Sequence, residues 1–320
     1  MDVGLATGLT GAEEIISRCR QLGVRFVTLA VDPMPGYREN FAPDRRFLSE
    51  LCERLADAEI TVSALNNRFG WERPDGPDPS VVEDISRHRR EVEGALGTLE
   101  LQGELGIGAQ VHYVGVPMPA DPARDELYWS NLTAYYREVV PQAERSGVRI
   151  ANHGIWRCLP LNLRDKAVAE GVTEHGYRSY RREGWQGPYL VRRADDIARI
   201  VQETPSPSNG VTLCTGMYIT GSDPVAEVRR FAGKIHFAQV RDLDARWPAA
   251  RELFPGAGRL DWKAIVGALV EAGFDGFIHP EHLGSPRRPG EDLELEATEL
   301  VRQWVAEAEA KAGRGDGRSG

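Results

Sequence analysis

The sequence predicts a closed (β/α)8 barrel, and three observations support that fold class. Short apolar runs alternate along the chain with amphipathic stretches that often end in glycine, which is the pattern of parallel strands covered by helices. Eight such strand units can be counted, and at a length of 320 residues this number favours a closed barrel over an open sheet. No G-x-G-x-x-G motif follows the first apolar run, so a dinucleotide-binding fold is not indicated.

The first half of the chain supplies four of the units. Residues 11–22 show the helical part of this pattern clearly, because their apolar positions recur at helical spacing and Gly23 follows the last of them. The predicted strands, each with the helix after it, are 3–8 with 11–22, 25–31 with 46–58, 60–65 with 81–106, and 109–115 with 125–146. A Pro-, Gly- and Asp-rich stretch at 68–80 is expected to be a long loop after the third strand.

The second half continues the pattern with longer interruptions. Its predicted strands are 148–152, 210–214, 235–240 and 273–278, with helices at 225–232 and 262–272. Residues 154–188 form a polar and aromatic insertion after strand five, and a loop of this length predicts a lid over the barrel mouth. We therefore expect one barrel domain at 1–305, with 154–188 as its insertion, followed by a flexible tail at 306–320 that begins as a frayed helix end.

Composition narrows the class of function. The formal charge is −9 and the pI is near 5.4, which argues against a nucleic-acid partner. No apolar run approaches the roughly 20 residues that cross a bilayer, and the first residues do not resemble a secretory signal. Four cysteines without framework spacing suit a reducing compartment. These features predict a cytoplasmic protein with a small-molecule ligand, and they are compatible with a homo-oligomer.

The ends of the last four predicted strands carry groups that bind metal ions. They are His153, Cys214, Gln239 and Glu281. Because the carboxyl ends of barrel strands meet at one mouth, we expect these side chains to lie close together. Mixed N, O and S donors suit Mn²⁺, Fe²⁺, Co²⁺ or Zn²⁺ better than Mg²⁺ or Ca²⁺. Taken singly, Cys214 could be a small core residue and His153 a buried hydrogen-bonding group, so the metal site depends on their joint placement.

Alternation along strand seven decides which of its side chains face inward. Phe237, Gln239 and Arg241 share one face, and His236 belongs to the other. We expect Gln239 and Arg241 to point into the barrel, because His236 would then lie near the entry of the strand. His236 as a metal ligand is the alternative.

At these same residues the chain resembles the mannonate dehydratases within the xylose-isomerase-like TIM barrels. The most specific matching segments are 208–216 (SNGVTLCTG), 231–243 (FAGKIHFAQVRDL) and 276–282 (GFIHPEH). Weaker matches are 113–117, 147–153 and 189–192, and the first hundred residues add only the barrel pattern. The resemblance implies D-mannonate dehydration to 2-keto-3-deoxygluconate with Mn²⁺ or Fe²⁺, and it makes Mn²⁺ the expected ion.

By resemblance, His153 and Cys214 match the family's first two ligands, and Glu281 stands where the family has Asp. Gln239 stands where the family has a ligand His, whereas His236 matches a neighbouring non-ligand position. His282 matches a family His implicated in proton transfer, but residues 285–299 contain no counterpart of its partner Tyr. These departures predict poor D-mannonate turnover and a diverged substrate.

Several further residues are expected to take part in turnover. His282 is the candidate acid or base, since a histidine pKa lies near neutrality, although it could instead orient Glu281. Tyr177 or Tyr180 of the insertion could supply a second proton relay. Arg241 could clamp a carboxylate in a fork. The residues expected to contact the substrate are Arg192, Tyr113, His279 and Trp156.

The sequence thus predicts a divalent-metal-dependent lyase that acts on a sugar acid or related polyhydroxy compound. An isomerase or epimerase would begin with the same proton abstraction beside a metal-bound oxygen, so it remains an alternative. A non-catalytic barrel with a decayed metal site, indicated by Gln239, is the second alternative.

Overall fold

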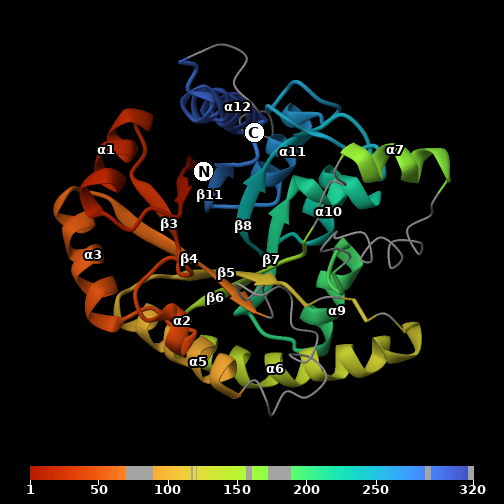
Figure 1. Cartoon of the computed structure of the whole chain (residues 1–320). Helices are drawn as coiled ribbons and strands as arrows, with labels where there is room; N and C mark the ends of the chain where they lie inside the picture. The colour runs from red at the N-terminus through yellow and green to blue at the C-terminus, as the bar shows by residue number, and fades with distance from the viewer. Residues whose placement is uncertain are drawn as a thin grey trace.

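The computed structural model describes residues 1–69, 89–116, 118–119, 121–155, 161–171, 189–284 and 290–315, and its strands form a ring enclosed by helices (Figure 1). The sheet order is β1-β11-β8-β7-β6-β5-β4-β3-β2, and every pairing in it is parallel. The strands are β1 (Asp2–Val3), β2 (Leu5–Thr7), β3 (Phe26–Ala30), β4 (Thr61–Phe69), β5 (Ala109–Val114), β6 (Arg149–His153), β7 (Asn209–Cys214), β8 (Ile235–Val240) and β11 (Phe277–Pro280). This confirms the predicted barrel.

The first barrel strand is split at Gly4, which is why nine segments stand where eight strands were predicted. β1 pairs with β11 and β2 pairs with β3, so the two halves join the ends of the sheet. Just after the break, within β2, the backbone N–H of Ala6 donates to His279 Nδ1 at 3.1 Å. Gly4 is required there, because a Cβ atom would lie 2.6 Å from the ring of Phe277.

Helices cover the outside of the ring, and they include each helix that was predicted within the described part of the chain. They are α1 (Ala12–Leu22), α2 (Tyr37–Asn40), α3 (Arg45–Asp57), α5 (Arg89–Glu104), α6 (Asp125–Ser146), α7 (Leu161–Ala169), α9 (Ala194–Glu203), α10 (Pro224–Arg230), α11 (Trp262–Glu271) and α12 (Leu293–Gly315). The side chain of Asp44 caps α3 and that of Asp261 caps α11. Of the predicted helix 81–106, the part before Arg89 lies outside the described residues, as does most of the predicted loop 68–80.

Two helical segments extend what the sequence predicts. The first part of the tail at 306–320, expected to be a frayed helix end, is helical as far as Gly315, because α12 continues through it. Its Ala, Glu and Lys residues favour helix, and Glu309 pairs with the chain's amino group at 2.6 Å. Helix α9 was not predicted, although its apolar residues recur at helical spacing. Within the insertion, α7 is described, whereas 156–160 and 172–188 lie outside the described residues.

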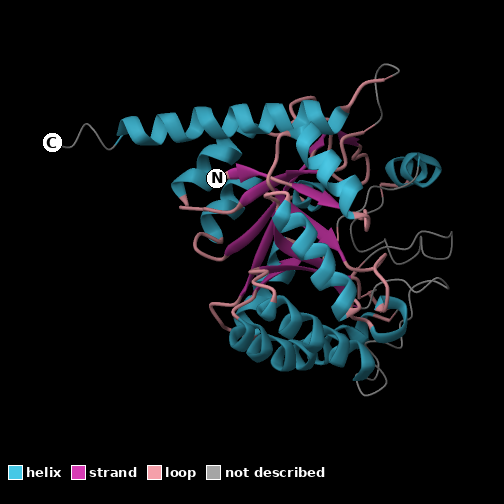
Figure 2. Cartoon of the chain, turned by 90° about the vertical axis from the view of Figure 1, so that its left-hand side faces the viewer, coloured by secondary structure: helices cyan, strands magenta, loops and turns pink. Residues whose placement is uncertain are grey.

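The interior of the ring is filled by small residues and one large ring. Ala64, Ala109, Val111, Ala151 and Phe237 form this buried cluster. In Figure 2 the strand arrows point toward the side that faces the viewer of Figure 1, so Figure 1 looks onto the mouth. Among the described residues, every helix is too short or too polar to cross a membrane. The packed interior leaves the mouth as the place for a site.

Candidate metal centre

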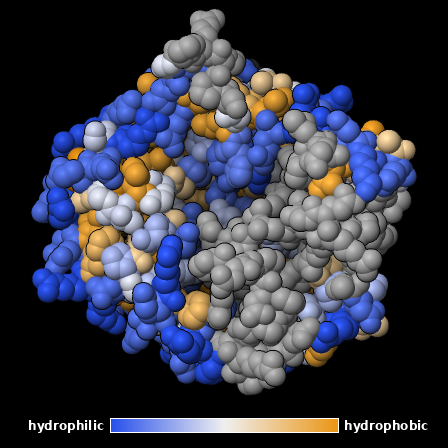
Figure 3. Space-filling view, in the orientation of Figure 1, coloured by the Kyte–Doolittle hydropathy of each residue, from blue (hydrophilic) through white to orange (hydrophobic). Residues whose placement is uncertain are grey.

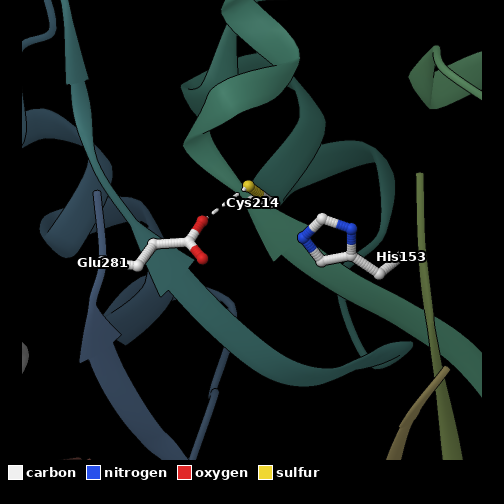
Figure 4. A group of neighbouring side chains, drawn as sticks. All are labelled: His153, Cys214 and Glu281. Carbon is white, nitrogen blue, oxygen red and sulfur yellow. Dashed lines mark hydrogen bonds between the residues drawn. The ribbon is translucent and has the colours of Figure 1, made fainter. Parts of the chain in front are cut away.

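Three of the predicted donors meet at the barrel mouth (Figure 4). His153 ends β6, Cys214 ends β7 and Glu281 directly follows β11. Their potential ligand atoms all lie within 4.8 Å of one another, and Cys214 Sγ donates to Glu281 Oε1 at 3.3 Å. Figure 3 shows hydrophilic side chains around a hollow near the middle of this face. We call His153, Cys214 and Glu281 the donor triad.

The protonation states of Glu281 and His153 suit a divalent cation, and that of Cys214 must change when one binds. Burial alone would raise the pKa of Glu281, but nearby groups, foremost the charge of Arg241, lower it to about 2, so the carboxylate is ionised. Burial lowers the pKa of His153 to about 4, which keeps its imidazole neutral. Burial raises the pKa of the Cys214 thiol to about 12. A bound cation would reverse that last shift, since coordinated thiols are deprotonated.

Gln239 lies in the same layer of the barrel as the donor triad. Its Cα is paired in register with those of Cys214 on β7 and His279 on β11. The side chain is 2% exposed, and its Nε2 donates to the Tyr113 hydroxyl at 2.7 Å. Within the part of the chain that is described, its Oε1 accepts no hydrogen bond. A buried, unsatisfied carbonyl oxygen at this level fits a position beside a cation.

Arg241 occupies the space next to the donor triad, and it is 3% exposed. Its Nη2 lies 3.4 Å from Cys214 Sγ, its Nε lies 3.4 Å from Glu281 Oε1, and its Nη1 donates to Glu252. Gly216 makes room for this guanidinium, because a Cβ atom there would lie 2.6 Å from Nη2. The donors of Arg241 thus face protein groups here, and its predicted role as a substrate clamp stays a prediction.

Sequence reasoning missed Glu252, which connects Arg241 to His282. Glu252 belongs to β10 (Glu252–Leu253), a two-residue strand paired antiparallel with β9 (Asp242–Leu243). Its second carboxylate oxygen lies 3.0 Å from His282 Nδ1. No periodicity marked residue 252, and only the pairing of this hairpin brings it to the mouth.

The remaining candidates lie at different distances from the donor triad. The Tyr113 ring is centred 4.4 Å from that of His153, and His279 is buried in register with Gln239. Arg192 precedes α9, and its backbone N–H donates to Asp196. Trp156, Tyr177 and Tyr180 lie outside the described residues.

His236 is not part of the site. Its Nδ1 lies 3.0 Å from the carbonyl oxygen of Ile150, and its ring packs against Gly210 at the amino-terminal end of the strands. The alternative in which His236 ligates the ion is therefore wrong, because its side chain faces away from the interior of the mouth.

The chain is similar in sequence to one family of TIM barrels and to several mannonate dehydratases. A family model described as a xylose isomerase-like TIM barrel matches residues 16–304. A mannonate dehydratase from Thermotoga petrophila is 26% identical over 321 residues, which cover 88% of this chain and 78% of that protein. One from Thermotoga neapolitana is 26% identical over 208 residues, or 58% of this chain and 49% of that protein. The chain thus spans about half the length of several curated relatives that it matches.

Solved structures share the fold at low sequence identity. A mannonate dehydratase from Streptococcus suis serotype 2 superposes with a TM-score of 0.70 at 16% identity, covering 98% of this chain and 96% of that one. A D-psicose 3-epimerase from Clostridium cellulolyticum H10 gives 0.67 at 16% identity, covering 95% and 99%. The IOLI protein, whose crystal structure contains a zinc atom, gives 0.65 at 18% identity, covering 97% and 99%. These likenesses concern the fold alone.

Proposed function

Because the chain belongs to the xylose isomerase-like TIM barrel family, we propose that it is a divalent-metal-dependent lyase that acts on a sugar acid or related polyhydroxy compound. The observation that carries this proposal is the donor triad at the barrel mouth. Mannonate dehydratases among the relatives support the dehydratase-like chemistry. The identity of the substrate is left open by the substitutions at residues 239 and 281 that separate this chain from the family pattern.

His153, Cys214 and Glu281 would hold the ion, with Gln239 Oε1 as a candidate fourth donor. A mixed set of imidazole, thiolate and carboxylate suits Mn²⁺, Fe²⁺, Co²⁺ or Zn²⁺, of which we propose Mn²⁺. When bound, such an ion polarises a substrate oxygen and stabilises negative charge that develops on it. Arg241 would keep Glu281 and Cys214 in place beside the ion, because its guanidinium contacts both.

His282 is the residue that we propose moves protons. Its side chain is 48% exposed, so it is accessible from the mouth, and its Nε2 lies 3.7 Å from Glu281 Oε2. A general base must reach the proton that it removes, and an exposed imidazole beside the donor triad can be approached by a substrate bound there. The lid function of residues 154–188, with Tyr177, Tyr180, Trp156 and Arg192 near the substrate, remains a prediction.

A second candidate function is a sugar isomerase or epimerase. The contacts of the buried Arg241 with Glu252 and Cys214 favour this function, because they occupy a guanidinium that would otherwise bind a substrate carboxylate. A neutral ketose or polyol needs no such clamp, and proton abstraction beside a polarised oxygen starts both reactions.

A substrate panel separates these functions. The protein, reconstituted with Mn²⁺, is incubated with sugar acids and with ketoses, and products are followed by mass spectrometry for loss of water and by NMR for changed stereochemistry. We expect loss of water from a sugar acid other than D-mannonate, and no reaction with the His153→Ala variant. Exchange of stereochemistry without loss of water would establish the second function. Metal content below stoichiometry after reconstitution would instead support a decayed, non-catalytic site.

A further inference from the structure

Glu252 bridges two residues of the mouth with its two carboxylate oxygens. Oε1 accepts a hydrogen bond from Arg241 Nη1, and Oε2 lies 3.0 Å from His282 Nδ1. Although burial alone would raise the pKa of Glu252, the bonds from His282 and Arg241 bring it below its ordinary value. An ionised carboxylate only accepts hydrogen bonds, so Nδ1 of His282 must carry the proton in this contact.

That contact determines what the other ring nitrogen can do. In a neutral imidazole only one nitrogen carries hydrogen, so a donating Nδ1 leaves a lone pair on Nε2. Nε2 is also the nitrogen nearer the donor triad, at 3.7 Å from Glu281 Oε2. The bond to Glu252 therefore presents the basic nitrogen on the side of the metal group.

The backbone of His282 gives a second reason for a positioning partner. Its φ is +49°, in the left-handed region that non-glycine residues adopt at a cost. Such conformations persist where surrounding contacts hold them, and they gather at functional sites. Because 48% of its side chain is exposed, the ring of His282 is only partly enclosed by the protein, and the contact with Glu252 is what fixes its orientation in this proposal.

We propose that Glu252 is a positioning residue that fixes the ring orientation and the Nδ1–H tautomer of His282, so that Nε2 is the nitrogen that exchanges a proton with substrate. The proposal rests on the proposed function for the role of His282 in turnover. In the forward step a substrate C–H proton moves to Nε2, its electron pair stays on the substrate, and the ring becomes an imidazolium. Glu252 remains ionised and stabilises that positive charge, as carboxylates beside functional histidines do.

The hairpin itself does not depend on the Glu252 side chain. Strands β9 and β10 pair through their backbones, and the following loop is fastened by the buried carboxylate of Asp242, which accepts bonds from the N–H groups of Gly256 and Gly258. A substitution at residue 252 can therefore report on His282 without removing the hairpin.

The test reads the tautomer of His282 directly and measures turnover separately. Protein with ¹⁵N-labelled histidine and bound Zn²⁺, which is diamagnetic, is studied by NMR at alkaline pH, where imidazole rings are neutral. The resonances of His282 are assigned by their loss in His282→Asn, since Asn tolerates a positive φ. The variants are Glu252→Ala, Glu252→Gln and, as the matched control in the same hairpin, Arg251→Gln, whose side chain pairs with Asp244.

We expect the Nδ1–H tautomer in the native protein and in Arg251→Gln, and its replacement by the Nε2–H form in Glu252→Ala. With the substrate identified by the panel, kcat of Glu252→Ala should fall 10- to 100-fold, while KM and metal content change less than about threefold. Glu252→Gln, which keeps an acceptor oxygen, should retain the tautomer and lose less of kcat. If Glu252→Ala does not fold, Glu252→Asp takes its place, because a shorter carboxylate cannot reach both partners.

Two results would overturn the positioning role: an unchanged Nδ1–H tautomer in Glu252→Ala, or an unchanged kcat once that tautomer is lost. Failure of the proposed function looks different, because the native protein would then turn over none of the panel. The tautomer comparison still decides in that case whether Glu252 fixes the ring.

Discussion

At the scale of single residues, the donor triad holds one proton that a cation must displace. Glu281 has a pKa of about 2 and His153 one of about 4, so at neutral pH each offers a lone pair without first losing a proton. Cys214, with its pKa raised by burial to about 12, is still a thiol there. Coordination requires the thiolate, so metal binding must release the Cys214 proton.

We therefore predict that binding of each divalent ion releases about one proton between pH 6 and 9. The sign follows from the pKa values: above pH 4 only the thiol must ionise, so the apparent affinity should rise about tenfold per pH unit in this window. Proton release on adding Zn²⁺ in weakly buffered solution measures it. The Cys214→Ser protein should release close to none, and equal release by that protein would contradict the assignment of the thiolate.

Residue 239 offers a second prediction at this scale. Replacing Gln239 by His exchanges an amide oxygen for imidazole nitrogen, a better donor for transition metals. If residue 239 faces the ion, affinity should increase by about tenfold or more, or about 1.4 kcal/mol. Competition with a chromophoric chelator measures the metal affinity of each variant. Tyr113→Phe is the control, because it removes the partner of Gln239 Nε2 and leaves residue 239 in place. Unchanged or weaker affinity in Gln239→His would count against Gln239 as a donor.

At the scale of elements, the hairpin that carries Glu252 depends on one buried carboxylate. Asp242 is fully buried and accepts hydrogen bonds from five donors: the backbone N–H groups of Leu243, Gly256, Gly258 and Leu260, and Trp262 Nε1. It joins the end of β8 to the start of α11. Losing this acceptor leaves several buried N–H groups without partners.

Asp242→Ala should therefore lower the free energy of unfolding by about 3–5 kcal/mol, since hydrogen bonds to a charged group are each worth about 1.5–3 kcal/mol and replacement contacts recover part of the loss. Urea unfolding followed by circular dichroism measures the change. The exposed Asp275→Asn, elsewhere in the same half of the barrel, should stay within about 0.5 kcal/mol. A loss below 1 kcal/mol for Asp242→Ala would show that water replaces the carboxylate there.

The same elements show which parts of the site can be predicted from the sequence and which cannot. His153, Cys214 and Glu281 could be placed together because each stands at the carboxyl end of an apolar strand, and parallel strands bring these ends to one mouth. Helix α9 was also open to prediction, since Ile197 and Ile200 lie three residues apart on its buried face. Glu252 was not, because antiparallel pairing of two-residue strands leaves no periodic signal. Side-chain alternation along the strand predicted that Arg241 points inward. It could not predict the contacts of Arg241, because one of its partners, Glu252, lies on that same hairpin.

The length of the C-terminal helix is hard to predict for a different reason. Residues 306–315 have few apolar positions, so they carry no strong amphipathic pattern. Their helix propensity is high, however, and the preceding Trp304 and Val305 are buried against the barrel, which gives α12 an anchored start from which to continue. A search for amphipathic periodicity therefore misses a helix that continues outward from a turn already packed against the barrel.

At the scale of the whole molecule, the donor triad connects strands from separate parts of the chain. His153, Cys214 and Glu281 lie on β6, on β7 and after β11, so a bound ion would tie these segments together in the folded state alone. A ligand that binds only the folded state adds stability that grows with its concentration, about 2.7 kcal/mol at 100 times its Kd. The effect should reach the global unfolding transition, because the barrel closes only when all strands are in place.

We predict that Mn²⁺ at about 100 times its Kd raises the Tm by about 4 °C, given an unfolding entropy of about 2.1 cal/mol/K per residue over the chain, and that a chelator reverses the rise. Scanning calorimetry measures the shift. Glu281→Gln should abolish it, because the neutral amide removes the ionised donor of the triad. His236→Asn should keep the full shift, although its Tm starts lower, because His236 lies at the opposite end of the strands beside Ile150. A shift that survives Glu281→Gln would place the stabilising ion elsewhere in the molecule.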